Sequence, residues 1–313
     1  MDLGFCHLFV IRHWKFVILF MLFIGNQKTF SFFQKSLSSG KLNHAYVFSG
    51  PEHVGKFTLA KMFALHAIEN TPLSLKVEDF GKEALFDLIV LAPEIVEKKN
   101  VAKQRDISVE SVREIKKNLS LFPYHGKYKI LIIDDAHKMN TAAQNALLKI
   151  LEEPNPTTII ILVTPEIDKI LPTIKSRCQT VNFSLISESE LLKHFPQNIV
   201  DVSTGRPGLS EIIAQNDGEL SFRLEAVENL NKIISGSINE KFILAEELSK
   251  DISKTSDLLN FWLWEMRKKA LFSENSERKN IYAGMEKIQK SLETLKNTNA
   301  NGRLILETLF LDL

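Results

Sequence analysis

Between residues 43 and 183, short apolar runs alternate with segments of helical periodicity, and this alternation restricts the fold more than any other feature of the sequence. Continuous runs of β-branched and other apolar residues are typical of strands buried on both faces of a sheet, and connecting helices make such strands parallel. The expected strands cover 44–50, 86–94, 128–135 and 157–164. The sequence therefore predicts an α/β core built on a parallel sheet.

Apolar residues also recur at helical spacing between and after these strands. The expected helices of the core cover 56–68, 108–122 and 141–153. Short helices interrupted by a turn at 204–208 follow the core, and from about residue 220 every segment has a helical period. We therefore expect three parts: a core over 21–183, a small helical domain over 184–218 and a helical bundle over 219–313.

The apolar stretch FVILFMLFI, at 16–24, follows Arg12 and Lys15 and is too short to span a bilayer. Three interpretations remain: an export or anchor signal, a buried first helix, and an extension that precedes the true start of the protein at Met21. We favour the last, in which residues 1–20 are an apolar N-terminal extension.

Charge and cysteine content exclude several classes of protein. Lys and Arg together exceed Asp and Glu by only one, so no global positive field marks a chain that binds nucleic acid by itself. Two cysteines, Cys6 and Cys178, are too few for a disulfide framework or for a zinc site of four cysteines. A reducing, cytoplasmic location is therefore expected.

The stretch SGPEHVGKFT contains most of a phosphate-binding loop. Gly50, Gly55 and Lys56 match G-x-x-x-x-G-K, in which glycines let backbone N–H groups converge on phosphates and the lysine reaches the terminal phosphate. Phe57 takes the place of the Ser or Thr that holds Mg²⁺, and Thr58 points about 100° further round the helix. The loop therefore predicts ATP binding and leaves the binding of Mg²⁺ open.

Two carboxylates end the third expected strand, at the edge where parallel sheets place their ligands. Asp134 is suited to hold Mg²⁺ through water, and Asp135 stands where a catalytic glutamate would polarise the attacking water. Asp is one methylene shorter than Glu, and a carboxylate about 1 Å short of its water costs on the order of 100-fold in rate. The alternative is that the pair caps the following helix, a task that Asn140 and Thr141 suit equally.

Three stretches of the sequence resemble the bacterial clamp-loader subunits, which are AAA+ proteins. They are KYKILIIDDAHKMNTAAQNALLKILEEP, TIIILVTPEIDKILPTIKSRCQ and, at the C-terminus, NTNANGRLILETLFLDL. Within this family the chain most resembles the delta-prime subunits of DNA polymerase III, from about residue 21 to the end. The resemblance implies an α/β fold with a RecA-like AAA+ core, a small helical lid and a C-terminal all-α collar through which subunits assemble.

The resemblance also implies roles for two residues. Ser176, Arg177 and Cys178 match the family's Ser-Arg-Cys motif, whose arginine is a finger that reaches the γ-phosphate bound by the adjacent subunit. Arg177 would then act in catalysis in trans, since a guanidinium spreads positive charge over developing phosphoryl charge. Thr164 matches the sensor position that monitors the nucleotide. Taken without the resemblance, Arg177 is a surface salt-bridge partner and Thr164 is a strand-end hydroxyl.

The chain departs from the ATP-hydrolysing gamma and tau subunits in three places. Those subunits have Ser or Thr after the loop lysine, Asp-Glu after the strand, and a four-cysteine zinc module after the first helix. Residues 67–85 contain no cysteine, so zinc is not expected there. Gly208 fills the position of a second sensor arginine, and Arg206, two residues earlier, either reaches a phosphate or lies in solvent.

Contact with DNA follows mainly from the resemblance, since such loaders track primed-template DNA through sequence-independent backbone contacts. The candidates are the charge run at 97–105 and the helix at 112–119. In that helix, Arg113, Lys116 and Lys117 match positions that the resemblance places on the inner side of the assembly. The alternative for the charge run is a solvated loop.

These features together predict a clamp-loader subunit that helps to place the sliding clamp on primed DNA with gamma or tau and delta partners, without contact to a membrane. Its own site would bind ATP weakly and hydrolyse it poorly or not at all, while Arg177 serves a neighbour. Two alternatives remain. One is a gamma- or tau-like subunit in which Thr58 and Asp135 suffice for hydrolysis, and the other is a membrane-associated AAA+ regulator anchored by residues 16–24.

Overall fold

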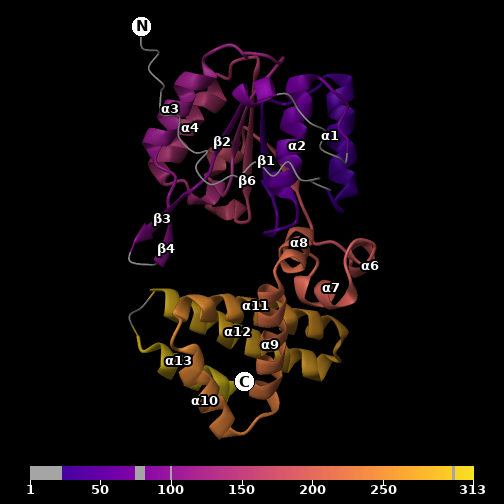
Figure 1. Cartoon of the computed structure of the whole chain (residues 1–313). Helices are drawn as coiled ribbons and strands as arrows, with labels where there is room; N and C mark the ends of the chain where they lie inside the picture. Colours follow the sequence, from indigo (N-terminus) through magenta and orange to yellow (C-terminus); the bar gives the residue numbers. More distant parts are fainter. Residues whose placement is uncertain (1–22, 75–81, 99–100, 298–299) are drawn as a thin grey trace. The chain divides into compact units, whose positions relative to one another are not determined.

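The computed structural model describes residues 23–74, 82–98, 101–297 and 300–313. The chain divides into two compact units (Figure 1). Unit 1 comprises the described residues up to Leu191 together with the separate segment 205–208, and unit 2 comprises 192–204 and the described residues of 209–313. The expected extension at 1–20 lies outside the described residues. The division into core, lid and collar stays a prediction.

Unit 1 is built on a five-stranded parallel sheet with the order β2-β5-β6-β1-β7. Its strands are β1 (Ala45–Ser49), β2 (Leu88–Leu91), β5 (Lys129–Ile133), β6 (Thr158–Thr164) and β7 (Gln179–Asn182). Every residue of β1, β5 and β6 is buried, as continuous apolar runs predict for the centre of a parallel sheet. The predicted α/β fold class is therefore confirmed.

The edge strand β7 has no counterpart among the expected strands. Its sequence, QTVN, contains a single apolar residue, Val181, so it has no alternation of apolar and polar residues that would predict a strand. Residues 179–182 nevertheless pair in parallel register with β1. Pairing along an existing sheet edge therefore supplies the order that local sequence does not.

Helices cover both faces of the sheet (Figure 1). They are α1 (Gln27–Ser39) and α2 (Lys56–Glu69) on one face, and α3 (Val109–Leu119) and α4 (Thr141–Glu152) on the other. The α1–α2 face is rich in aromatic rings, and the ring of Phe33 contacts those of Tyr46, Phe48 and Phe63. The α3–α4 face buries mainly aliphatic side chains. The two packed layers hold the strand ends, where the predicted site residues lie.

Of the charge run, the described residues 97–98 and 101–105 belong to two antiparallel strands, β3 (Glu94–Lys98) and β4 (Val101–Arg105). Both strands contain β-branched residues, Ile95 and Val96 in β3 and Val101 in β4, and such residues favour extended backbone. The charges obscure this signal because they dominate the composition of the run. The interpretation of the described part of this run as a loop is therefore wrong.

Short helical turns complete unit 1. They are η1 (Lys82–Phe86), η2 (Ala136–Lys138), η3 (Ile167–Lys169), α5 (Pro172–Lys175) and α6 (Glu188–Leu191). Phe23 and Ile24, at the described end of the apolar stretch, are buried in this unit, and the ring of Phe23 stacks on that of Phe30 at 5.9 Å. No helix within the described ranges is long and apolar enough to cross a membrane.

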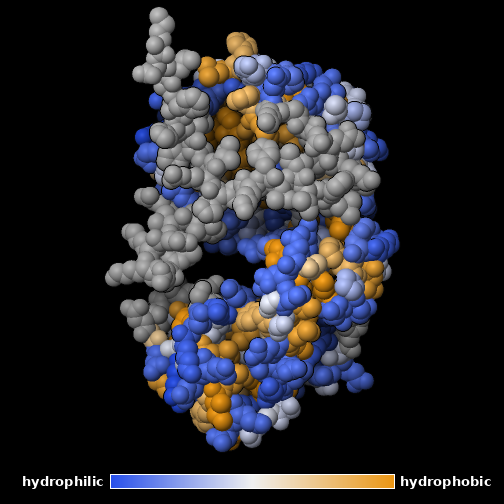
Figure 2. All heavy atoms as spheres, viewed as in Figure 1, coloured by the Kyte–Doolittle hydropathy of each residue, from blue (hydrophilic) through white to orange (hydrophobic). Residues whose placement is uncertain are grey.

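Among the described residues of unit 2, every regular element is a helix. Its helices are α7 (Gln197–Ser203), α8 (Pro207–Gln215, which begins in unit 1), α9 (Asp217–Ser235), α10 (Ile238–Leu248), α11 (Ile252–Phe272), α12 (Asn275–Asn297) and α13 (Gly302–Asp312). The helices expected after residue 220 are all present. Figure 2 shows hydrophilic and hydrophobic side chains interspersed on the visible face of this unit, as amphipathic helices produce.

The core of unit 2 is organised around Trp262. Its side chain is fully buried, and its ring lies 5.9 Å from that of Phe310. The indole N–H donates to the carbonyl oxygen of Ala226 at 2.7 Å, so the polar atom of the ring is satisfied. Trp262 therefore joins α11 to both α9 and α13.

Candidate functional site

The phosphate-binding loop joins β1 to α2, and its two key glycines have positive φ. Gly50 has a φ of 145°, and a Cβ at this position would lie 2.3 Å from the carbonyl oxygen of Phe183, so no larger residue fits. Gly55 has a φ of 91°, and Lys56 opens α2 directly after it. Strand, loop and helix N-terminus therefore stand in the order that phosphate binding requires.

Lys56 is buried at the start of α2. Its Nζ donates to the carbonyl oxygen of Gly50 at 2.6 Å and also to the carbonyl oxygen of Pro51. Burial lowers the pKa of Lys56 to about 8, although the nearby carboxylates of Glu52, Asp134 and Asp135 oppose this shift. The ammonium is therefore held inside the loop, close to the acidic pair.

Asp134 and Asp135 directly follow β5 at the carboxyl edge of the sheet. The backbone N–H of Asp134 donates to the carbonyl oxygen of Leu91 at 2.8 Å, and its carboxylate accepts the N–H of Asp135 at 3.1 Å. Burial, and next the charge of Asp135, raise the pKa of Asp134 to about 6. Asp134 therefore loses its negative charge in mildly acidic solution.

The carboxylate of Asp135 is paired with a lysine. The Nζ of Lys138 lies 3.0 Å from Oδ2 of Asp135, and both side chains are mostly buried, with exposed fractions of 26% and 30%. Asn140 caps α4, because its Oδ1 accepts the N–H of Ala143 at 2.8 Å. The alternative that the two acids cap this helix is therefore wrong.

Thr164 is fully buried at the end of β6. Its hydroxyl oxygen accepts the backbone N–H of Glu166 at 3.0 Å. Glu166 also lies 3.7 Å from Nε2 of His137, whose side chain is 7% exposed and whose pKa is lowered by burial. Thr164 thus organises the loop after its strand, and its role as a sensor stays a prediction.

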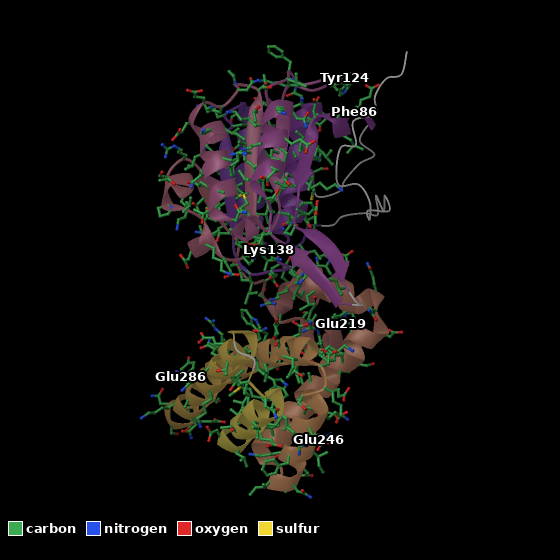
Figure 3. The ribbon with its side chains drawn as sticks, turned by 90° about the vertical axis from the view of Figure 1, so that its left-hand side faces the viewer. Phe86, Tyr124, Lys138, Glu219, Glu246 and Glu286 are labelled. Carbon is green, nitrogen blue, oxygen red and sulfur yellow. The ribbon has the colours of Figure 1, made fainter. Side chains whose placement is uncertain are left out.

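A cleft of about 470 Å³ opens over the loop and the acidic pair. It is lined by Glu52, His53, Gly55, Lys56, Phe57, Thr58, Asp134, Asp135, Lys138, Val163, Pro165 and Gly208. Figure 3 shows Lys138 at this end of unit 1 and Phe86 with Tyr124 at the opposite end. The structure therefore brings most of the predicted nucleotide residues together, and Gly50 joins them through its hydrogen bond from Lys56.

The residues of the cleft fit a phosphate group better than a magnesium ion. Phe57 lines the cleft and packs against the aromatic core, while Thr58 brings a hydroxyl to the same lining. Mg²⁺ prefers oxygen ligands in octahedral arrangement, and the ammonium of Lys138 places a positive charge beside the carboxylates. No group of three or more Asp, Glu, His or Cys among the described residues could hold a metal. The segment 67–85, where zinc is not expected, lies partly outside the described residues.

Arg206 lies near the same loop, within unit 1. Its side chain is half-buried, and its charge is one of the causes that lower the pKa of Lys56. The N–H of Gly208 donates to the carbonyl oxygen of His53 at 2.9 Å, which ties the start of α8 to the phosphate-binding loop. Of the two interpretations of Arg206, the one that leaves it in solvent is therefore wrong.

Arg177 follows α5 and does not belong to the lining of the cleft. Its Nη2 lies 2.9 Å from Oε1 of Glu152, and its Nη1 donates to the carbonyl oxygen of Thr173 at 3.0 Å. The side chain is 37% exposed. Arg177 therefore forms a surface salt bridge within this chain, and its action as a finger stays a prediction.

Arg113, Lys116 and Lys117 are exposed on α3. The apolar residues of the same helix are buried against the sheet, so the cations lie on its outer side. Contact of these cations with DNA stays a prediction.

The sequence did not single out Lys138, Glu52 or His53 as members of the site. Lys138 stands three residues after Asp135 in a helical turn, a spacing that brings side chains together. This spacing is the signal that could have identified it. Glu52 and His53 differ, since they have no pattern of their own and enter the cleft only through the path of the loop.

A five-stranded parallel sheet with a phosphate-loop motif and an acidic pair at its carboxyl edge, followed by a helical region, defines an α/β protein of the phosphate-loop class. Residues 25–187, more than half of the chain, match the protein family described as DNA polymerase III, delta subunit. The chain belongs to this family.

Curated proteins that are similar to this chain carry related names. The chain is 27% identical over 261 residues to the DNA polymerase III subunit gamma of Buchnera aphidicola subsp. Acyrthosiphon pisum, covering 76% of this chain and 70% of that protein. It is 29% identical over 256 residues to the tau subunit of Bacillus subtilis, covering 76% of this chain and 45% of that protein. A solved structure of a gamma subunit-related protein from Thermotoga maritima is 20% identical, with a TM-score of 0.45, and covers 90% of this chain and 97% of that chain.

Proposed function

We propose that this chain is a clamp-loader subunit of the delta-prime type, which helps to load a sliding clamp onto primed DNA together with gamma or tau and delta subunits. Its contribution to ATP hydrolysis is Arg177, supplied in trans to the nucleotide site of a neighbouring subunit. The observation that carries this proposal is the position of Arg177, which lies outside the chain's own cleft, exposed and held in one orientation by Glu152.

An arginine used in trans must be rigid and accessible at the same time. Two hydrogen bonds, to the carboxylate of Glu152 and to the carbonyl oxygen of Thr173, hold the guanidinium, while 37% of the side chain stays exposed. Such a fixed fork loses little entropy when it meets a phosphate. Arginine fingers in related phosphoryl transfer are worth about 10³–10⁵ in rate.

The chain's own cleft supports binding of a nucleotide more than its hydrolysis. Lys56 and the loop glycines provide the phosphate site, whereas Phe57 replaces the hydroxyl that orders Mg²⁺. Asp135 is shorter than the usual glutamate and is engaged by Lys138 at 3.0 Å, so it is a poor group to polarise water. We therefore propose a subunit that activates a neighbour and turns over little ATP itself.

The test is steady-state ATP turnover by the complex reconstituted with gamma-type and delta subunits, clamp and primed DNA. Arg177→Ala is expected to lower turnover by about tenfold or more with assembly intact. Lys175→Ala, two residues away, is the matched control and should leave turnover unchanged. Unchanged turnover with Arg177→Ala would overturn the role in trans.

One alternative, a gamma- or tau-like subunit that hydrolyses ATP by itself, is favoured by the similarity to gamma and tau relatives over about three quarters of the chain. In that case the hydroxyl of Thr58 would have to bind Mg²⁺, and the carboxylate of Asp135 would have to polarise the attacking water. Robust turnover by the isolated chain, abolished by Lys56→Ala, would support this alternative against the delta-prime proposal.

A further inference from the structure

The cleft contains a fixed cation directly beside the acidic pair, next to the carboxylate that would be expected to hold a metal. Lys138 comes from η2, directly after the acidic pair, and its side chain lines the cleft with a 26% exposed fraction. Its Nζ is 3.0 Å from Oδ2 of Asp135, and its charge also lowers the pKa of Asp134. One ammonium therefore acts on both carboxylates.

The opposite wall of the cleft presents no compensating metal ligand at the usual position. The residue after Lys56 is Phe57, whose ring lines the cleft. Thr58 is the hydroxyl of this helix turn that reaches the lining. A divalent cation held by Asp134 would be repelled by the ammonium of Lys138, whose charge already acts on that carboxylate.

The positive charges around the cleft suit a polyphosphate that arrives without metal. Lys56 and Lys138 both line the cleft, and the charge of Arg206, the residue before α8, acts on Lys56. Facing them are the carboxylates of Glu52, Asp134 and Asp135, and Lys138 is the residue that neutralises this acidic side of the cleft. Without Lys138, a phosphate group would meet the carboxylates directly, and repulsion would oppose its binding.

We propose that this cleft binds a nucleoside polyphosphate as the free anion, and that Lys138 is the residue that replaces Mg²⁺ in holding its phosphates. This inference rests on the proposed nucleotide binding and deepens it. It also gives the ion pair with Asp135 a purpose: the lysine that binds the phosphates keeps the carboxylate from acting on water, so the nucleotide is held and not consumed.

The experiment is equilibrium binding of a fluorescent ATP analogue to the full chain, followed by anisotropy, in EDTA and in Mg²⁺. The wild type is expected to bind with about the same Kd in both solutions. Lys138→Met should weaken binding in EDTA by about tenfold or more, and Lys138→Arg should restore most of it. Lys169→Met, which removes an exposed lysine paired with Glu166, is the matched control and should leave Kd unchanged.

Several results would overturn the inference. One is binding by the wild type that Mg²⁺ tightens by about tenfold or more, especially if Thr58→Ala abolishes this gain, because Thr58 would then hold the metal. Another is an unchanged Kd with Lys138→Met, and a third is no binding at all. Thermal unfolding of each variant checks that the loss of affinity is not a loss of folding.

The binding assay and the turnover assay separate this inference from the proposed function. The role of Arg177 is measured in the reconstituted complex and needs no nucleotide in this chain's cleft. Loss of turnover with Arg177→Ala, together with metal-dependent binding, would leave the function standing and remove the role of Lys138. Metal-independent binding with an unaffected Arg177→Ala complex would do the reverse.

Discussion

The guanidinium of Arg177 lies 2.9 Å from the carboxylate of Glu152, so the last residue of α4 orients a side chain that follows α5. If Arg177 acts in trans, this ion pair fixes its direction before the neighbour arrives. Glu152→Ala is therefore expected to lower ATP turnover of the reconstituted complex several-fold, and by less than Arg177→Ala does. Its effect on the free energy of unfolding should be under about 1 kcal/mol, because both side chains are partly exposed.

Glu153 offers a matched control, since it is an exposed glutamate next in sequence to Glu152. Glu153→Ala should leave turnover unchanged in the same complex. Equal losses from the two glutamate variants would show that acidity at the end of α4, and not the orientation of Arg177, affects turnover.

A second prediction concerns the pH dependence of stability. The pKa of Asp134 in the folded chain is about 6, above its usual value of 3.8, so the folded state binds this proton more tightly than the unfolded state. The resulting stabilisation is complete below pH 3.8 and is lost as the pH rises to about 6. Asp134→Asn should therefore stabilise the chain above pH 6 by up to about 2–3 kcal/mol, and the gain should shrink in acid.

Urea unfolding of wild type and Asp134→Asn across this pH range measures the effect. Asp168→Asn, at an exposed aspartate of the same unit, is the control and should show no such pH-dependent gain. A gain that is equal at acidic and neutral pH would show that the substitution acts through packing and not through the charge of Asp134.

The centre of the fold was predictable because its signals are local. Strand β6 is a run of β-branched residues that can be buried only inside a sheet, and α4 begins at the cap residue Asn140. Strand β7 was missed because its order comes from pairing with β1, which lies far away in the sequence. Strands β3 and β4 were missed because charge hides their β-branched residues.

The site shows the same division between local and distant signals. Gly50, Gly55 and Lys56 were recognisable because a phosphate-binding loop is one continuous segment. The ion pair of Lys138 with Asp135 was predictable from the same kind of local signal, since the two residues stand three apart in a helical turn. Arg206 approaches Lys56 only because the chain returns to unit 1 at 205–208.

A third prediction concerns Asp87, which is fully buried at the end of the sheet opposite the cleft. Its carboxylate accepts the backbone N–H groups of Tyr124, His125 and Gly126 at 2.6, 2.8 and 3.0 Å. Asp87→Ala leaves three donors without this acceptor, at a cost of about 3 kcal/mol or more. Hydrogen exchange of these three amides should then accelerate by about 100-fold or more.

Asp87→Asn keeps one acceptor oxygen in a side chain of the same shape and should therefore show an intermediate acceleration. The amides of α2 serve as an internal reference, because that helix does not depend on these hydrogen bonds. Unchanged exchange of the Tyr124, His125 and Gly126 amides in Asp87→Ala would contradict the anchoring role of the carboxylate.

A fourth prediction tests why the chain's own site hydrolyses poorly. Phe57→Thr restores the metal hydroxyl, Asp135→Glu restores the length of the base, and Lys138→Met removes the competing ammonium. The triple variant is expected to hydrolyse ATP at least about tenfold faster than the wild-type chain alone, measured by phosphate release. Each single variant should gain little, because metal and base act as a unit.

The exposed cations of α3 give the last prediction. If Arg113, Lys116 and Lys117 contact the backbone of primed DNA, replacing all three with Ala should weaken DNA binding by the complex for every sequence alike. The slope of log Kd against log salt should also fall by about 2–3, because each phosphate contact that is lost removes the release of about one counterion on binding. Lys35→Ala, at an exposed lysine of α1, is the control. A salt slope that does not change in the triple variant would place the DNA path on another surface of the subunit.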